Sequence, residues 1–482
     1  MAQIIKNRVV IIGAGPAGLA AGYKLCESGV KPIILEKDSC VGGLSRTIKY
    51  NGCSFDIGGH RFFTKNKLVF NWWQDILKED FVKTPRYSRI YYQGKFFNYP
   101  ISVANVIFNL GIFHSVPVIF SYLKSRIFPS KDEKSFEKWV TNRFGYRLYR
   151  IFFKSYTEKI WGIPADQISA DWAMQRIKGL SLTSVLRNAL FKDRKNAIKT
   201  LIKEFYYPRL GSGMMYEAVG ERIASRGGLI KLNSEVVRIK HDKNRITALI
   251  CRDAQEGRLF EVEGAEFCSS MPLNLLVSRM DPLPAGHILQ MCGRLNYRSL
   301  IMAYFVLGRR ELFKDNWIYI HSSDVAVCRI QNYKNWSAAM VSDPDESSLG
   351  LEYFCTEGDS MWQKSDKAMI ELAADELERL KISVKKDIRG AFVLRVPNAY
   401  PVYDKDYRQA LKAVQDFIGG FSNLQCIGRT GMFCYNGMDH SVLTGFLAAE
   451  NIFGAKNDLW GVNADQSYLE EFKDSGNDNS EL

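Results

Sequence analysis

Three glycines near the start of the chain, Gly13, Gly15 and Gly18, have the G-x-G-x-x-G spacing that can hold a diphosphate. They follow an apolar run and come at the head of a stretch with helical periodicity. The first glycine permits a tight turn, the second lets a phosphate approach the backbone, and the third lets a helix lie close to a sheet. The N–H groups at the start of that helix would bind the phosphates.

An acid and a second pair of glycines follow at the positions that a dinucleotide site requires. Glu36 ends the next apolar run, about 20 residues further on, where a carboxylate accepts hydrogen bonds from an adenosine ribose and disfavours a 2′-phosphate. Gly42 and Gly43 would let another stretch of backbone pass close to the cofactor. These residues predict a bound dinucleotide.

The elements that position these residues form a βαβ unit, with a buried strand over Arg8–Ile12, a helix over Ala17–Ser28 and a strand over Pro32–Leu35. Strands are expected over Leu229–Cys251, Arg258–Ser269 and Cys426–Gly428, and a final helix over Met438–Phe453. A second helix N-terminus, opened by Asn436-Gly437-Met438, could face a negatively charged part of the cofactor.

The fold class is therefore predicted as α/β, with a Rossmann-like dinucleotide domain, a helical insertion and a substrate domain with a mixed or antiparallel sheet. Strands over Arg298–Gly308 and Trp317–Asn332 would form that second sheet. We expect the dinucleotide domain at 1–100, 206–285 and 411–465, the helical region at 101–205, the substrate domain at 286–410 and a flexible acidic tail at 466–482.

Composition narrows the class of protein. The 482 residues carry a formal charge of +13, but Lys and Arg are spread along the chain, which argues against a nucleic-acid partner. Ten cysteines without a C-x-x-C pair argue against a metal site and indicate reduced thiols in a cytoplasm. The apolar stretch at 101–128 is interrupted by polar residues and Pro117, so it predicts paired buried or amphipathic helices, with peripheral membrane contact as the weaker alternative.

Motifs along nearly the whole chain resemble those of the UDP-galactopyranose mutases, within the amine oxidase and protoporphyrinogen oxidase superfamily. The most specific are D-I-G-G-H-R-F-F-T from Asp56, K-S-Y-T-E-K-I-W-G from Lys154 and C-R-I-Q-N from Cys328. The resemblance implies an FAD cofactor, bound by Gly13, Gly15, Pro16, Ala17, Gly18, Glu36, Lys37, Gly42, Gly43, Leu44, Ser45, Gly59, His60, Val237, Arg298, Gly428, Arg429, Met438, Asp439 and Ser441.

The same resemblance implies a substrate site. Tyr156 and Trp161 would line a uridine pocket, Arg329 and Tyr400 would hold a diphosphate, and Arg176 would assist them. His60, beside the flavin, would be catalytic together with Arg329 and Tyr400. The family places another diphosphate arginine where this chain has Leu180, which departs from the pattern.

Two activities follow from the resemblance. The first is the interconversion of the pyranose and furanose forms of a nucleotide sugar through a reduced-flavin N5 adduct, in cell-surface polysaccharide biosynthesis, with a reductant such as NAD(P)H to prepare the flavin. The alternative is an FAD-dependent oxidoreductase of the protoporphyrinogen oxidase or amine oxidase type. Leu180 and Phe63, where the mutases usually have a second histidine, favour this alternative because they make the pocket more apolar.

Overall fold

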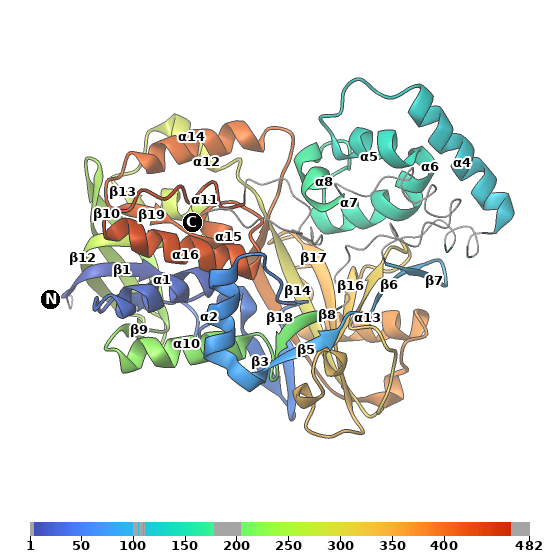
Figure 1. Cartoon of the computed structure of the whole chain (residues 1–482), viewed down its shortest axis with the longest axis horizontal. Coiled ribbons are helices and arrows are strands. Elements are labelled where there is room, and N and C mark those ends of the chain that lie inside the picture. The colour runs from blue at the N-terminus through green and yellow to red at the C-terminus, as the bar shows by residue number, and fades with distance from the viewer. Residues whose placement is uncertain (1–3, 100–104, 106–108, 110, 178–203, 464–482) are drawn as a thin grey trace, which may run out of the picture.

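The computed structural model describes residues 4–99, 105, 109, 111–177 and 204–463 (Figure 1). Its first sheet has parallel strands at the centre, because β1 pairs in parallel with β2 on one side and with β12 on the other. The strands are β1 (Ile4–Ile12), β2 (Ile33–Leu35), β9 (Leu229–Lys231), β10 (Ser234–Asp242), β11 (Arg245–Asp253), β12 (Leu259–Ser269), β13 (Met280–Asp281) and β19 (Leu424–Cys426). Their order is β13-β10-β11-β12-β1-β2-β9, with β19 beside β12.

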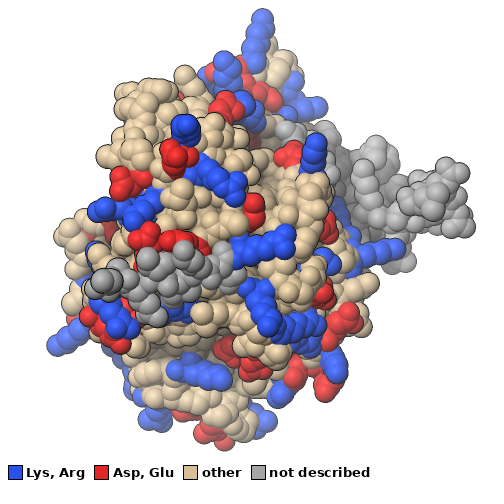
Figure 2. Space-filling view, turned by 90° about the vertical axis from the view of Figure 1, so that its left-hand side faces the viewer, with Lys and Arg blue, Asp and Glu red and all other residues tan. Residues whose placement is uncertain are grey.

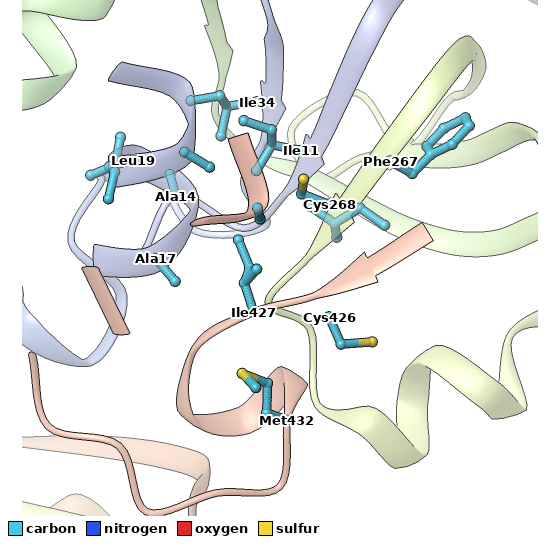
Figure 3. Close-up of a cluster of buried hydrophobic side chains, with 14 of the residues drawn as sticks. Ile11, Ala14, Ala17, Leu19, Ile34, Phe267, Cys268, Cys426, Ile427 and Met432 are labelled. Carbon is cyan, nitrogen blue, oxygen red and sulfur yellow. The ribbon is translucent and has the colours of Figure 1, made fainter. Parts of the chain in front are cut away.

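The centre of this sheet is buried on both faces. Val9, Val10 and Ile11 are fully buried, as a continuous apolar run in a parallel strand requires. Side chains from β1, β2, β12, β19 and the helix after β1 meet in one apolar cluster (Figure 3). The helices around the sheet are α1 (Pro16–Glu27), α2 (Lys67–Leu77), α10 (Gly213–Ser225), α11 (Leu273–Ser278), α12 (Gly286–Cys292), α14 (Tyr407–Gly419), α15 (Gly428–Gly431) and α16 (Met438–Ile452).

Small residues let α1 and α16 pack closely. A Cβ atom on Gly445 of α16 would lie 2.2 Å from the carbonyl oxygen of Ala17 in α1. Close approach of the two helices therefore depends on a glycine at this position. It brings the N-terminal ends of both helices to the same edge of the sheet (Figure 1).

A second sheet carries the other half of the molecule. Its order is β18-β14-β17-β16-β15-β6-β7, and it is mixed because β15 and β6 run in parallel while the other neighbours are antiparallel. Helix α13 (Asp366–Arg379) contacts β14 and β18. The strands are β6 (Ser88–Tyr92), β7 (Lys95–Asn98), β14 (Tyr297–Leu307), β15 (Trp317–Ile320), β16 (Arg329–Asn332), β17 (Ser347–Cys355) and β18 (Ile388–Pro401).

Two two-stranded antiparallel sheets complete the strands. One is a hairpin of β3 (Thr47–Tyr50) and β4 (Cys53–Asp56), and the other pairs β5 (Phe81–Pro85) with β8 (Glu204–Pro208), which are far apart in the chain. A helical region lies at the upper right of Figure 1. It contains α4 (Ile112–Ile127), α5 (Phe136–Phe144), α6 (Tyr146–Leu148), a π-helical turn (Tyr149–Lys154), α7 (Ser155–Trp161) and α8 (Ala170–Ile177). None of the helices in the described residues has the length and apolarity to cross a bilayer.

The predicted α/β class and the mixed second sheet are confirmed, with two local differences. The last strand of the first sheet ends at Cys426 rather than Gly428, because Gly428, at φ +75°, turns the chain into α15. Pro117 does not interrupt the chain there but lies inside α4. On the face of the molecule shown in Figure 2, Lys and Arg alternate with Asp and Glu, so that face carries no field of one sign.

Candidate cofactor and substrate site

The glycine turn after β1 has the geometry that its sequence predicts. Gly13 has a φ of +98°, and a Cβ atom there would lie 2.2 Å from the Ser270 hydroxyl oxygen. A Cβ atom on Gly18 would lie 1.9 Å from the carbonyl oxygen of Gly13, so this glycine is required for packing. A Cβ atom on Gly15 would meet only the Cα of Gly43, at 3.9 Å, so space above Gly15 is open to a ligand.

Glu36 lies beside this turn and is held by two backbone groups. The N–H of Ala14 donates to Oε2 of Glu36 at 2.7 Å, and the N–H of Asp38 donates to Oε1 at 2.9 Å. Burial raises the pKa of the Glu36 carboxyl, while both backbone hydrogen bonds lower it. Each carboxylate oxygen keeps lone pairs for further donors, such as the two hydroxyls of a ribose.

These residues line a cavity of about 560 Å³. Its walls include most of the predicted cofactor residues: Gly13, Gly15, Pro16, Ala17, Glu36, Lys37, Gly43, Leu44, Ser45, His60, Gly428, Arg429, Met438 and Ser441. Gly42 supports the wall from behind, since its N–H donates to the carbonyl of Ala14 at 2.8 Å. The volume is typical of small-molecule sites, and the glycine turn, the open space at Gly15 and the buried acid fit the adenosine diphosphate part of FAD.

A second cavity, of about 340 Å³, shares His60, Arg429, Gly437 and Met438 with the first. The two cavities therefore meet at the N-terminus of α16, where the flat ring system of FAD would lie between them. Gly59 and Asp439 line the second cavity only. Nε2 of His60 lies 2.7 Å from the carbonyl oxygen of Ile57, and burial lowers the pKa of its imidazole, so the ring is neutral at pH 7.

The predicted substrate residues Tyr156, Trp161, Arg329 and Tyr400 all line the second cavity. Nη2 of Arg329 donates to the hydroxyl of Tyr400 at 3.4 Å. Nε of the same guanidinium donates to Glu352 at 2.7 Å, and Glu352 is fully buried. The guanidinium thus has a fixed orientation at the cavity wall.

Aromatic rings form much of the remaining wall. Tyr156 stacks on His321 with ring centroids 4.3 Å apart, and Trp161 packs edge-on against Trp172 at 4.7 Å. Nε1 of Trp161 and Nδ1 of His321 are buried without a hydrogen-bond partner among the described residues. Buried polar atoms of this kind mark places where a ligand can supply the missing partner.

Two predicted residues, Arg298 and Val237, differ from their expected placement. Arg298 lines neither cavity: its Nε donates to the carbonyl of Ile160 at 2.9 Å, and its Nη1 donates to Thr356 at 2.5 Å. Arg298 therefore holds the end of α7. Val236 lines the first cavity in place of Val237, because a bulge between Val236 and Arg238 shifts the alternation of β10. Arg176 lies in α8, but its side chain, like Leu180, is outside the described residues.

Several wall residues were missed by the sequence analysis: His321, Trp172, Gln331, Trp317 and Tyr319. They come from helix α8, strands β15 and β16 and the segment after β15, and nothing in their local sequence indicates a site. The sequence analysis also missed Glu352, although the β17 sequence indicates that this residue has a special role. It is the only charged residue in the β17 segment S-S-L-G-L-E-Y-F-C, and a charge in such a strand needs a buried partner.

The sequence is similar to those of known proteins. The sequence profile of the flavin containing amine oxidoreductases matches residues 16–452. A probable UDP-galactopyranose mutase of Klebsiella pneumoniae is 25% identical over 180 residues, covering 34% of this chain and 43% of the relative. A 4,4′-diapophytoene desaturase of Methylomonas is 46% identical over 52 residues, which is 11% of this chain and 10% of the relative. The matched segments thus span less than half the length of these curated relatives.

Solved structures share the fold over nearly the whole chain. A reduced UDP-galactopyranose mutase superposes with a TM-score of 0.79 at 21% identity, covering 96% of this chain and 99% of the other. A putative protoporphyrinogen oxidase of Exiguobacterium gives a TM-score of 0.69 at 15% identity, with 92% and 98% covered. The matched profile, which spans most of the sequence, shows that this chain belongs to the flavin containing amine oxidoreductase family, with FAD as its cofactor.

Proposed function

We propose that this protein converts a nucleotide sugar between its pyranose and furanose forms. One observation carries the proposal: Arg329 and Tyr400, in contact at 3.4 Å, line the same cavity as Tyr156 and Trp161, and that cavity meets the cofactor cavity at His60. An anion-binding group and aromatic rings for a base thus lie on the walls of one space that ends at the flavin site.

The charges of the cavity wall suit a diphosphate. Arg61, Arg329 and Arg429 line the cavity, and Asp439 is the carboxylate among its described lining residues. Glu352 neutralises part of the Arg329 charge from behind the wall but also holds its fork in place. The excess positive charge would attract a dianionic group, and the guanidinium fork would bind its oxygens in bidentate fashion.

The other residues would orient the substrate and exclude water. The free face of Tyr156 can stack on a base, since His321 covers the other face. Bound FAD would supply the reactive ring, and the protein must stabilise the negative charge of its reduced form. The N-terminus of α16 and the guanidinium of Arg429, 5.2 Å from the Tyr400 ring and 4.8 Å from the Tyr435 ring, would favour negative charge there.

An oxidoreductase acting on an apolar substrate is the second candidate, which the apolar part of the same wall favours. Phe63, Phe136, Phe152 and Phe153 line the cavity together with Ile90. Such rings would contact a flat or lipophilic substrate. That substrate would transfer a hydride to the flavin, and an external acceptor would then reoxidise the flavin. The K. pneumoniae relative and the mutase structure lead us to prefer the mutase.

The test is to reduce the purified protein with dithionite and add UDP-galactopyranose, then separate the products by chromatography. We expect UDP-galactofuranose to form without stoichiometric use of reductant, and only with the reduced protein. Oxygen uptake driven by an organic substrate, with no furanose product, would contradict the mutase and support the oxidoreductase.

Tyr400→Phe is the informative variant, because it removes the hydroxyl that contacts Arg329 and leaves the ring. We expect UDP to bind roughly tenfold more weakly, as loss of one hydrogen bond to a charged group would cause. Tyr50→Phe is the matched control, since the Tyr50 hydroxyl bonds the Ala391 carbonyl at 3.4 Å and lines neither cavity.

A further inference from the structure

Helix α4 exposes a row of large apolar side chains on its outer face. Phe120 is 68% exposed, Ile127 is 67% exposed, and Phe128, at the end of the helix, is 75% exposed. Val116, Ile119 and Leu123 are exposed on the same helix. Exposed apolar residues that gather on one element mark an interaction surface, whereas scattered ones do not.

The exposed residues form a stripe opposite the side on which α4 packs. Val118 and Tyr122 are buried, and Val118 joins the apolar core of the helical region. At 3.6 residues per turn, the stripe lies on the other side of the helix, with Lys124 on one flank and Arg126 on the other. Helix α4 lies at the outer edge of the helical region in Figure 1, so this stripe faces away from the molecule.

Basic residues surround the stripe. Residues 111–131 contain no Asp or Glu, and Lys124, Arg126 and Lys131 are exposed there. Arg147 is also exposed, and its backbone N–H donates to the Ser121 hydroxyl at 3.1 Å, which places it against α4. The next acids along the chain, Asp132 and Glu133, are paired with Lys138 and Arg143.

We propose that α4 docks the protein in the plane of an anionic lipid surface, with its apolar stripe among the acyl chains and its flanking cations at the headgroups. An apolar stripe between basic flanks is the pattern of helices that lie in the interface. The helix has 16 residues, about 24 Å, too short to cross a bilayer of about 30 Å.

The charge pattern favours lipid over a second copy of this chain. A symmetric dimer through α4 would bring the basic flanks of two copies together, and residues 111–131 offer no acid to pair with them. Those like charges would repel, whereas anionic headgroups would attract all of them. This inference does not depend on the reaction that the protein catalyses, because the stripe lies outside both cavities.

Vesicle flotation tests the proposal with the full-length, FAD-loaded protein. Vesicles of equal parts phosphatidylglycerol and phosphatidylcholine should carry the protein, and vesicles of phosphatidylcholine alone should carry much less. Phe120→Asp with Ile127→Asp should lower binding more than roughly tenfold, because the stripe then resists burial. Lys124→Gln with Arg126→Gln should lower it roughly fivefold for each charge removed at low salt.

Leu283→Asp with Phe453→Asp is the matched control, since Leu283 is 65% exposed and Phe453 is 47% exposed, and neither belongs to the helical region. This variant should float like the wild type, and an unchanged flavin spectrum would show that every variant is folded. The proposal is wrong if the folded wild type does not float or floats equally with neutral vesicles. It is also wrong if light scattering shows a dimer that the α4 substitutions dissociate.

Discussion

Arg329 and Glu352 form an ion pair at the wall of the second cavity, with Nε of the arginine 2.7 Å from Oε2 of the glutamate. Glu352 is fully buried, and Nε2 of Gln331 also donates to it, at 2.5 Å. Burial raises the pKa of the Glu352 carboxyl, and the Arg329 charge lowers it. Loss of Glu352 would therefore change two properties: the stability of the second sheet, and the positive charge that Arg329 offers to a substrate.

Glu352→Gln should separate these two effects. The variant leaves the Arg329 charge without its buried partner, so the free energy of unfolding should fall by about 3 kcal/mol. UDP should bind more tightly if the cavity is folded, because the full guanidinium charge is then available to the diphosphate. Urea unfolding and calorimetry measure the two quantities.

Glu235→Gln is the control for this variant. Glu235 pairs with Arg279 at 2.7 Å, but its side chain is 33% exposed, so the loss of unfolding free energy should stay within about 1 kcal/mol. A similar loss in both variants would show that burial of the Arg329–Glu352 pair has no special effect.

His321 should make the folded protein less stable in acid. Burial, with the nearby Lys159 charge, lowers the pKa of its imidazole to about 3, while the Phe152 carbonyl raises it. Between about pH 3 and pH 6.5 the unfolded chain binds a proton that the folded chain does not, so stability falls as the pH falls through this window. The contribution of His321 between pH 7 and pH 5 is about 2 kcal/mol.

Urea unfolding of the wild type and His321→Gln at both pH values measures that contribution. The variant should lose about 2 kcal/mol less than the wild type on acidification, although His60, whose imidazole pKa is also lowered, still contributes. Equal pH dependence of the two proteins would mean that His321 is protonated as easily in the folded state as in the unfolded chain.

Gly18→Ala should damage the cofactor turn. Its Cβ atom would lie 1.9 Å from the carbonyl oxygen of Gly13, so α1 must move away from β1. We expect a loss of about 2–3 kcal/mol in unfolding free energy and poor retention of FAD, measured by the ratio of visible to ultraviolet absorbance. Gly419→Ala is the control, since nothing lies within 4 Å of its added Cβ atom, and it should bind FAD normally.

Glu36→Gln should weaken FAD binding without unfolding the protein. An amide replaces one of two oxygens that accept backbone N–H groups, and it also loses the charge offered to the ribose. The dissociation constant for FAD should rise roughly 10- to 100-fold. Fluorescence of released flavin measures the change, and exposed Glu221→Gln in α10 should leave it unaltered.

Most of the cofactor residues that local patterns predict line the first cavity. The glycine turn and Glu36 lie within one βαβ unit, where spacing along the chain fixes spacing in space. Val236 rather than Val237 lines the first cavity because of a bulge in β10, which depends on pairing with β11 and is not revealed by sequence spacing alone. Arg298 lines neither cavity, and its partners Ile160 and Thr356 lie 138 and 58 residues away along the chain, beyond the reach of local sequence patterns.

The substrate end was harder to predict for the same reason. Residues such as His321 and Trp172 reach the cavity because distant segments pack together, and nothing in their neighbours marks them. Tyr156 and Trp161 were found only through the resemblance of their motif to a known family, since aromatic residues in a helix are usually core residues.

The first sheet joins segments from both ends of the chain, which has a consequence for biosynthesis. Ile4 pairs with Glu261, and Phe267 pairs with Leu424, so the sheet cannot close until nearly all of the polypeptide has left the ribosome. The N-terminal glycine turn therefore gains its sheet partners only late in synthesis, and we expect the cofactor to bind after the chain is complete.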